Sequence, residues 1–144
     1  MATKKNLKGI RGWLILLGIY IGVKAIRSLN SFLILFIGFI KGSISIENNL
    51  LILMSYIELV YNFVIMLAMI YIAYLFFQES KRFPKWFIGI HILIPIFYII
   101  DVSIVQTILQ KSLFKVEDLL LTILPCIWIP YLLLSKRVKT TFIN

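Results

Sequence analysis

Five side chains that carry charge or form strong hydrogen bonds lie inside long apolar stretches of this 144-residue chain. They are Lys24, Arg27, Glu58, Asn62 and Asp101. An ionised group at the centre of a bilayer costs about 2.5–3.5 kcal/mol on insertion scales, so each one needs a partner, water or the membrane interface. Two bases and two acids balance to zero charge, as a buried cluster requires. The five residues define a candidate intramembrane polar cluster that could hold a ligand or pass a proton.

The polar residues of each apolar segment fall on one side of a helical wheel at 100° per residue. The three stripes are Tyr20, Lys24, Arg27 and Ser31, then Ser55, Glu58 and Asn62, then His91, Tyr98 and Asp101. At 1.5 Å per residue from the inner boundary, the cluster lies about 16–30 Å deep, in the outer half of the membrane. Two interpretations stay open. The cluster lines a polar cavity, or its side chains extend separately to the outer headgroups or pair only to fix helix register.

Other residue types with chemical potential form no recognisable catalytic pattern. There is no nucleophile with a base and an orienting group, no phosphate loop and no zinc-protease signature. His91 has no Cys, His or carboxylate at ligand spacing, so we expect a packed or hydrogen-bonding histidine rather than a metal ligand. Cys126, between two prolines, is expected to be a small apolar filler. We expect no enzyme activity, no cofactor and no metal.

The elements that must position these residues follow from composition. Hydrophobic residues make up 61% of the chain and charged residues only 15%, against about 25% charged residues in soluble domains. Such a chain is neither soluble nor disordered. Because about 20 apolar residues cross a bilayer as a helix, the sequence predicts one all-α, polytopic integral membrane domain over residues 1–144, a bundle of four transmembrane helices. The predicted spans are residues 12–29, 50–77, 86–105 and 119–134.

Two segments of this plan allow alternatives. Residues 30–49 are predicted as an outer interfacial segment and loop, but one long, strongly tilted helix from Gly12 to Ile40 is also compatible with the pattern. The outer loop over residues 106–118 alternates apolar and polar residues and predicts a short interfacial helix. Pro95, Pro125 and Pro130 should kink the third and fourth spans.

Basic residues indicate the orientation of the bundle. Ten of the fifteen Lys and Arg fall in residues 1–11, 78–85 and 135–144, accompanied by one acid, Glu79. By the positive-inside rule these segments, and both termini, are cytoplasmic, as in a bacterial inner (cytoplasmic) membrane. The net charge of +9 then serves topology and attraction to anionic lipids of the bilayer. No folded basic surface remains for nucleic acid. The expected inner-interface anchors are Trp13, Trp86, Trp128, Tyr131, Arg82, Lys136 and Arg137.

Gly18 and Gly22 form a GxxxG spacing and are the candidate helix-packing residues of the first span. Glycines four residues apart let another helix approach closely. Packing within the chain or exposure to lipid is the expected use of this pair.

Three sequence motifs lie at the inner face of the predicted bundle. They are Gly9-Ile10-Arg11-Gly12-Trp13-Leu14, then Phe76-Phe77 with Lys81-Arg82-Phe83-Pro84, and finally Trp128-Ile129-Pro130-Tyr131 with Ser135-Lys136-Arg137-Val138-Lys139-Thr140-Thr141-Phe142. With these motifs the chain resembles, over nearly its whole length, the bacterial four-pass membrane proteins grouped as domain of unknown function 2569 (DUF2569). Arg11 stands where that family more usually has a small residue. The resemblance implies a four-helix inner-membrane protein with both ends in the cytoplasm, and it implies no activity.

Short loops and absent catalytic chemistry favour a non-enzymatic protein that acts through helix contacts, as an interaction protein, a sensor or an accessory subunit. Its partner would be another membrane protein or a second copy of the chain. The alternative is a small transporter or channel component that uses the polar cluster, and it would need oligomers to enclose a pore. The two classes differ in whether the charged residues converge on a cavity.

Overall fold

The computed structural model describes residues 9–41, 49–110, 112 and 114–143, and all regular elements among them are helical. In chain order they are α1 (Trp13–Ile40), α2 (Asn49–Phe77), α3 (Phe83–Leu109), α4 (Val116–Ile123), the 3₁₀ helix η2 (Leu124–Ile127), α5 (Trp128–Leu134) and α6 (Lys136–Thr141). Among the described residues, four segments are long and apolar enough to cross a membrane: α1, α2, α3 and the composite Val116–Leu134. The predicted all-α bundle with four spans is therefore confirmed.

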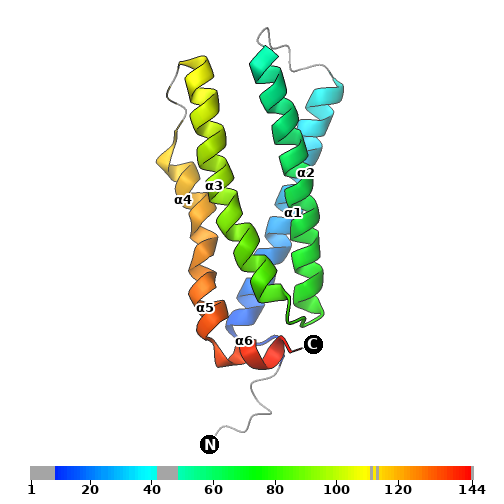
Figure 1. Ribbon diagram of the computed structural model, residues 1–144. Helices are drawn as coiled ribbons and strands as arrows, with labels where there is room; N and C mark the ends of the chain where they lie inside the picture. Colours follow the sequence, from blue (N-terminus) through cyan, green and yellow to red (C-terminus); the bar gives the residue numbers. More distant parts are fainter. Residues whose placement is uncertain (1–8, 42–48, 111, 113, 144) are drawn as a thin grey trace, which may run out of the picture.

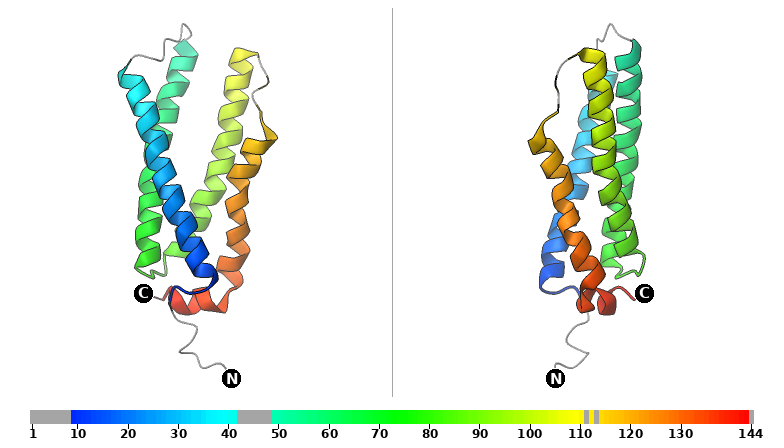
Figure 2. Two further views of the ribbon diagram at one scale, coloured as in Figure 1. Left: turned by 180° about the vertical axis from the view of Figure 1, so that it is seen from behind. Right: turned by 60° about the vertical axis from the view of Figure 1, so that its left-hand side comes forward.

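The first span is one continuous helix of 28 residues, Trp13–Ile40. This agrees with the alternative of one long helix from Gly12 to Ile40. The prediction of a span over residues 12–29 followed by a separate interfacial segment is wrong for residues 30–40, which continue α1. The physical reason is that no proline interrupts this stretch, and Lys24 and Arg27 leave its apolar period intact. At 1.5 Å per residue the helix is about 42 Å long and exceeds the hydrocarbon thickness, and it runs obliquely past α2 (Figure 2).

The third and fourth spans differ in regularity. α3 carries Pro84 in its first turn, where no backbone donor is lost, and ends at Gln110 in the left-handed conformation. The separate interfacial helix expected over residues 106–118 is not formed by the described part of that segment. Its ends belong to α3 and α4 instead, while Lys111 and Leu113 lie outside the described residues. As expected, Pro125 interrupts the fourth span, which tightens into η2 before α5.

A compact hydrophobic core occupies one end of the bundle, where α1 begins, α2 ends, α3 begins and α5 ends (Figure 1). We call it the basic end, because Arg11, Arg82, Lys136 and Arg137 flank these helix ends. Aromatic rings dominate its centre: Phe76 and Phe83 lie 5.1 Å apart between ring centroids. The buried core residues are Leu14, Leu17, Ile21, Met69, Ile72, Leu75, Phe76, Phe83, Phe87, Leu132, Val138 and Phe142.

The short helix α6 lies across the basic end and closes it (Figure 1). Phe142 stacks on Phe83 with ring centroids 4.7 Å apart. Thr141 joins the two ends of the described chain, since its Oγ1 accepts from the Gly9 N–H at 3.2 Å and donates to the Gly9 carbonyl at 3.4 Å. The closing motif Ser135 to Phe142 thus has a structural role that its basic residues alone do not suggest.

At the opposite end the helices separate into two pairs, α1 with α2 and α3 with α4 (Figure 2). Among the described residues of these long helices, the buried side chains stop at Ile21 in α1, at Met66 in α2 and at His91 in α3. In these helices, fully buried side chains are therefore confined to the basic half of the bundle. Cavities between the two pairs occupy the other half.

Candidate functional site

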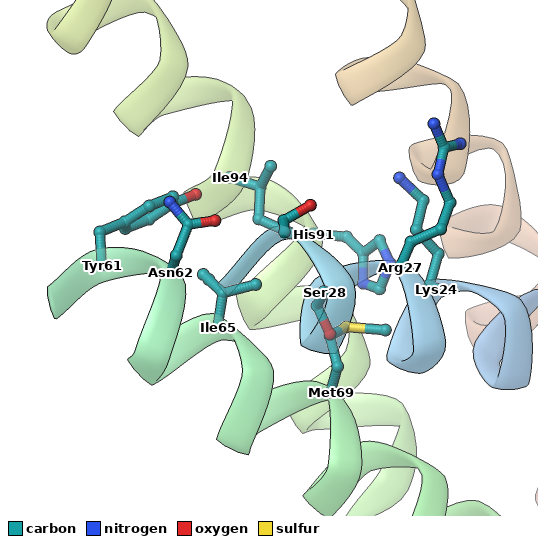
Figure 3. A pocket seen from close by; sticks show the side chains of 10 residues that line it. Lys24, Arg27, Ser28, Tyr61, Asn62, Ile65, Met69, His91 and Ile94 are labelled. Atoms are coloured by element: carbon teal, nitrogen blue, oxygen red, sulfur yellow. The ribbon is translucent and has the colours of Figure 1, made fainter. Parts of the chain in front are cut away.

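The first cavity, which we call the cationic cavity, has a volume of about 290 Å³ and lies between α1, α2 and α3 (Figure 3). Lys24 and Arg27 extend side by side from α1, whereas Tyr61 and Asn62 lie across from them on α2. The Nζ of Lys24 also lies 6.0 Å from the ring centroid of Tyr20, which is within cation–π range. The lining residues are Lys24, Arg27, Ser28, Ser31, Tyr61, Asn62, Ile65, Met69, His91 and Ile94.

The second cavity, the acidic cavity, has a volume of about 230 Å³ and lies between α2, α3 and α4. Its acidic lining residues are Glu58 of α2 and Asp101 of α3. Three residues, Tyr61, Asn62 and Ile94, line both cavities, so the two spaces adjoin. The lining residues are Glu58, Tyr61, Asn62, Ile94, Phe97, Tyr98, Asp101 and Thr122.

The five residues of the predicted polar cluster thus line two adjoining cavities and are divided by the sign of their charge. Within the described residues, neither Lys24 nor Arg27 has a nitrogen within 4.0 Å of a carboxylate oxygen. A direct ion pair between the first span and Glu58, one way in which the cluster could have served helix register, is not formed. Each cavity instead holds two like charges, with Asn62 on the wall between them.

An aromatic stack stands at the boundary between the cavities. The rings of Tyr61 and Phe97 lie 3.6 Å apart and are parallel to within 4°, so they join α2 to α3. Beside them, the Nδ2 of Asn62 donates to the Glu58 carbonyl at 2.9 Å. This bond orients the Asn62 amide and leaves its oxygen able to accept a hydrogen bond from a ligand.

His91 forms the deepest polar contact of the cationic cavity and is 2% exposed. Its Nδ1 donates to the Phe87 carbonyl at 2.9 Å, and its Nε2 accepts from the Tyr20 hydroxyl at 2.9 Å. The tautomer follows from the partners, because a carbonyl oxygen can only accept. The prediction of a hydrogen-bonding histidine is confirmed, and the bond to Tyr20 joins α3 to α1. No group of three or more potential metal ligands occurs in the described ranges.

Cys126 adds the fourth span to this network. Its Sγ donates to the His91 carbonyl at 3.4 Å, so it is a weak hydrogen-bond donor as well as a filler.

The two glycines of the GxxxG spacing have different surroundings. A Cβ added to Gly18 would lie 2.8 Å from Cε1 of Phe76, whereas one added to Gly22 would meet no atom within 4 Å. Only Gly18 therefore serves a close helix contact inside the chain, between α1 and α2.

The predicted interface anchors gather at the basic end. Trp13 and Trp128 meet edge to face with centroids 6.5 Å apart, and Trp128 contacts Tyr131 in the same manner at 6.0 Å. Trp86 contacts Tyr71 at 5.2 Å. Among the cationic anchors, Arg82 and Lys136 are exposed and Arg137 is half-buried. Their contact with lipid headgroups stays a prediction.

Several lining residues were missed by sequence reasoning: Ser28, Tyr61, Ile94, Phe97 and Thr122. Tyr61 follows Glu58 by three positions, so helical spacing alone places it on the same face and could have identified it. Phe97 and Thr122 belong to the site through the packing of α3 against α2 and α4, which no local pattern indicates.

Four apolar spans with charged side chains between them define a multi-pass helical membrane protein. Within that class the chain belongs to the family described as "Protein of unknown function (DUF2569)", whose model matches residues 7–143. The resemblance seen in the three motifs is thereby confirmed. No curated protein and no solved structure matches the chain.

Proposed function

We propose that the protein binds a small polar ligand between its two helix pairs, as a ligand-binding or transport component of the membrane and not as an enzyme. The supporting observation is that the charged residues of the cluster line two adjoining cavities. Ionisable residues inside a membrane are costly and usually mark a ligand or ion pathway. The cavities thus favour the transporter or channel class over a protein that acts through helix contacts alone.

Binding is better supported than free conduction. The aromatic core of Phe76, Phe83 and Phe142 fills the basic end beneath the cavities. A path through a single chain would have to cross this core, so passage would require a rearrangement of α6 or assembly with a second copy.

In the orientation that we propose, the basic end faces the cytoplasm of a bacterial cell and the cavities lie in the outer half of the inner membrane. The basic loops and the aromatic anchors support this arrangement by the positive-inside rule. Anionic lipids of the inner leaflet would contact Arg82 and Lys136, whose side chains are exposed.

Cysteine accessibility tests whether the site admits water. In a Cys126→Ser background, Asn62→Cys in the cavity wall is compared with Ile26→Cys, which is 70% exposed on α1 and outside both linings. A charged, membrane-impermeant thiol reagent requires a hydrated thiolate, so we expect modification at position 62 and none at position 26. Resistance at both positions in intact cells would show a dry, sealed bundle and would exclude a ligand-binding cavity.

A second candidate is the helix-contact role that the sequence favoured, with another membrane protein or a second copy as partner. The observation in its favour is Gly22, which has open space beside it and exposed apolar neighbours such as Ile19 and Ile26. Disulfide crosslinking of Gly22→Cys in a Cys126→Ser background tests this role. Gly89→Cys, an equally open glycine on α3, is the matched control. Crosslinking at both positions alike would indicate random collision and argue against a specific contact.

A further inference from the structure

The separation of charge between the two cavities carries information about the ligand. Lys24 and Arg27 lie in one cavity, Glu58 and Asp101 in the other, and no ion pair among the described residues joins the two sets. A cluster that served stability alone would be expected to pair its opposite charges, because an unpaired charge within the membrane is costly.

Each cavity also places two side chains of like formal charge near each other, and these repel. Lys24 and Arg27 are three residues apart on α1 and therefore lie on adjacent turns, where like charges destabilise each other. Glu58 and Asp101 face the same space from α2 and α3. A counter-charge that enters each cavity relieves both repulsions, and the two counter-charges are of opposite sign.

We propose that the two cavities together bind one zwitterion, with its anionic group at Lys24 and Arg27 and its ammonium group at Glu58 and Asp101. This inference rests on the proposed ligand-binding function and names its ligand class. The net charge of such a ligand is zero, which matches the balanced formal charges of the four residues. Its two ends lie in adjoining spaces, since Tyr61, Asn62 and Ile94 line both.

The side chains of each cavity suit these groups. The planar guanidinium of Arg27 can bind two oxygens of a phosphate or carboxylate at once, and Lys24 adds a point charge. On the acidic side, the rings of Tyr61 and Phe97 add aromatic surface beside the carboxylates, and an ammonium is attracted to such surface.

The volumes of the cavities indicate a ligand larger than a single inorganic ion. The cavities have volumes of about 290 and 230 Å³, and together they fall in the range of roughly 300–1,000 Å³ typical of small-molecule sites. A phosphate and an ammonium joined by a two-carbon chain have the required chemistry. Such a group occurs as a free metabolite-sized zwitterion or as the headgroup of a phospholipid, and the test separates these sources.

The experiment is calorimetric titration of the purified full chain in a non-ionic detergent with three probes. They are dihexanoyl phosphatidylethanolamine, dihexanoyl phosphatidylglycerol, which keeps the phosphate but lacks the ammonium, and glycerophosphoethanolamine, which keeps the neutral zwitterionic phosphodiester without acyl chains. We expect the ethanolamine lipid to bind at least tenfold more tightly than the glycerol lipid. Binding of glycerophosphoethanolamine as tight as that of the ethanolamine lipid identifies a soluble zwitterion, and much weaker binding identifies a lipid headgroup. Equal or tighter binding of the glycerol lipid overturns the proposal.

Substitutions in the cavities test whether the preference for the ethanolamine lipid over the glycerol lipid arises there. Glu58→Gln combined with Asp101→Asn should bring the two lipids within twofold of each other, while Arg27→Gln should weaken both. Glu79→Gln, a carboxylate outside both linings, is the matched control and should leave the tenfold preference intact. If the double variant unfolds, Glu58→Gln alone serves, since Glu58 is an exposed residue. A full preference in the folded variant overturns the proposal.

The outcomes separate this inference from the proposed function. Absence of binding by all three probes, with the thiol at position 62 still accessible, refutes the zwitterion and leaves a water-filled ligand site in place. Inaccessibility at position 62 refutes the ligand site itself.

Discussion

Alanine at Gly18 should destabilise the bundle, because the added methyl group has no room. Its Cβ would lie 2.8 Å from Cε1 and 3.2 Å from Cζ of Phe76. That ring is fully buried and is held by Phe83 and Phe142, with centroids 5.1 and 5.7 Å away. Since the ring cannot move freely, the helices must shift apart, and overpacking of this kind costs about 1–3 kcal/mol.

Gly22→Ala is the matched control on the same helix, one turn further along. No atom lies within 4 Å of the Cβ that it would add, and alanine is a better helix former than glycine by about 0.8–1.0 kcal/mol. Its stability should therefore equal or slightly exceed that of the wild-type chain. The two variants change the same chemical group and differ only in what the methyl group meets.

Reversible unfolding in mixed detergent micelles, followed by circular dichroism, measures both free energies. A second variant, Gly18→Ala with Phe76→Leu, should be more stable than the sum of the single changes predicts, because the smaller side chain gives the methyl group room. Equal stability of Gly18→Ala and Gly22→Ala would show that α1 and α2 do not approach each other closely at Gly18. It would contradict the contact between Gly18 and Phe76.

Three further outcomes are expected. Tyr20→Phe should lower the free energy of unfolding by about 1–3 kcal/mol, because it leaves the buried Nε2 of His91 without a donor; an unchanged free energy would contradict the bond. Glu58→Gln and Arg27→Gln should have additive effects within about 0.5 kcal/mol, since no ion pair joins them, and a larger coupling energy in a double-mutant cycle would reveal one. A reporter fused at Ser80 should be cytoplasmic by the positive-inside rule, and an external signal there would overturn the proposed orientation.

The hydrophobic core and the charged cavities lie at opposite ends of the bundle. Nearly all buried apolar side chains lie at the basic end, which α6 closes through Phe142 and the bonds between Thr141 and Gly9. The charged side chains lie beyond His91, where the helix pairs separate. Substitutions in the cavities should consequently change binding with little effect on folding, and substitutions in the aromatic core should do the reverse.

The sequence by itself determined the fold class, the number of spans and the faces of the polar residues. These features are local, because hydrophobic length selects a span and the helical period selects a face. Residues of all three polar stripes do line the cavities, as their one-sided spacing suggested, although Tyr20 and Ser55 are not among the lining residues. The sequence also showed the motif from Ser135 to Phe142, but its spacing did not predict the hydrogen bond between Thr141 and Gly9.

Only the tertiary structure decided which of these faces meet. The sequence could not show that Tyr61 stacks on Phe97, or that one glycine of the GxxxG pair is contacted and the other is open. Each depends on where and at what angle two helices cross, which is set by many small packing contacts between distant segments. The separation of the charges into two cavities has the same origin: the period of each helix fixes which way a side chain points, and the crossing of the helices fixes what it meets.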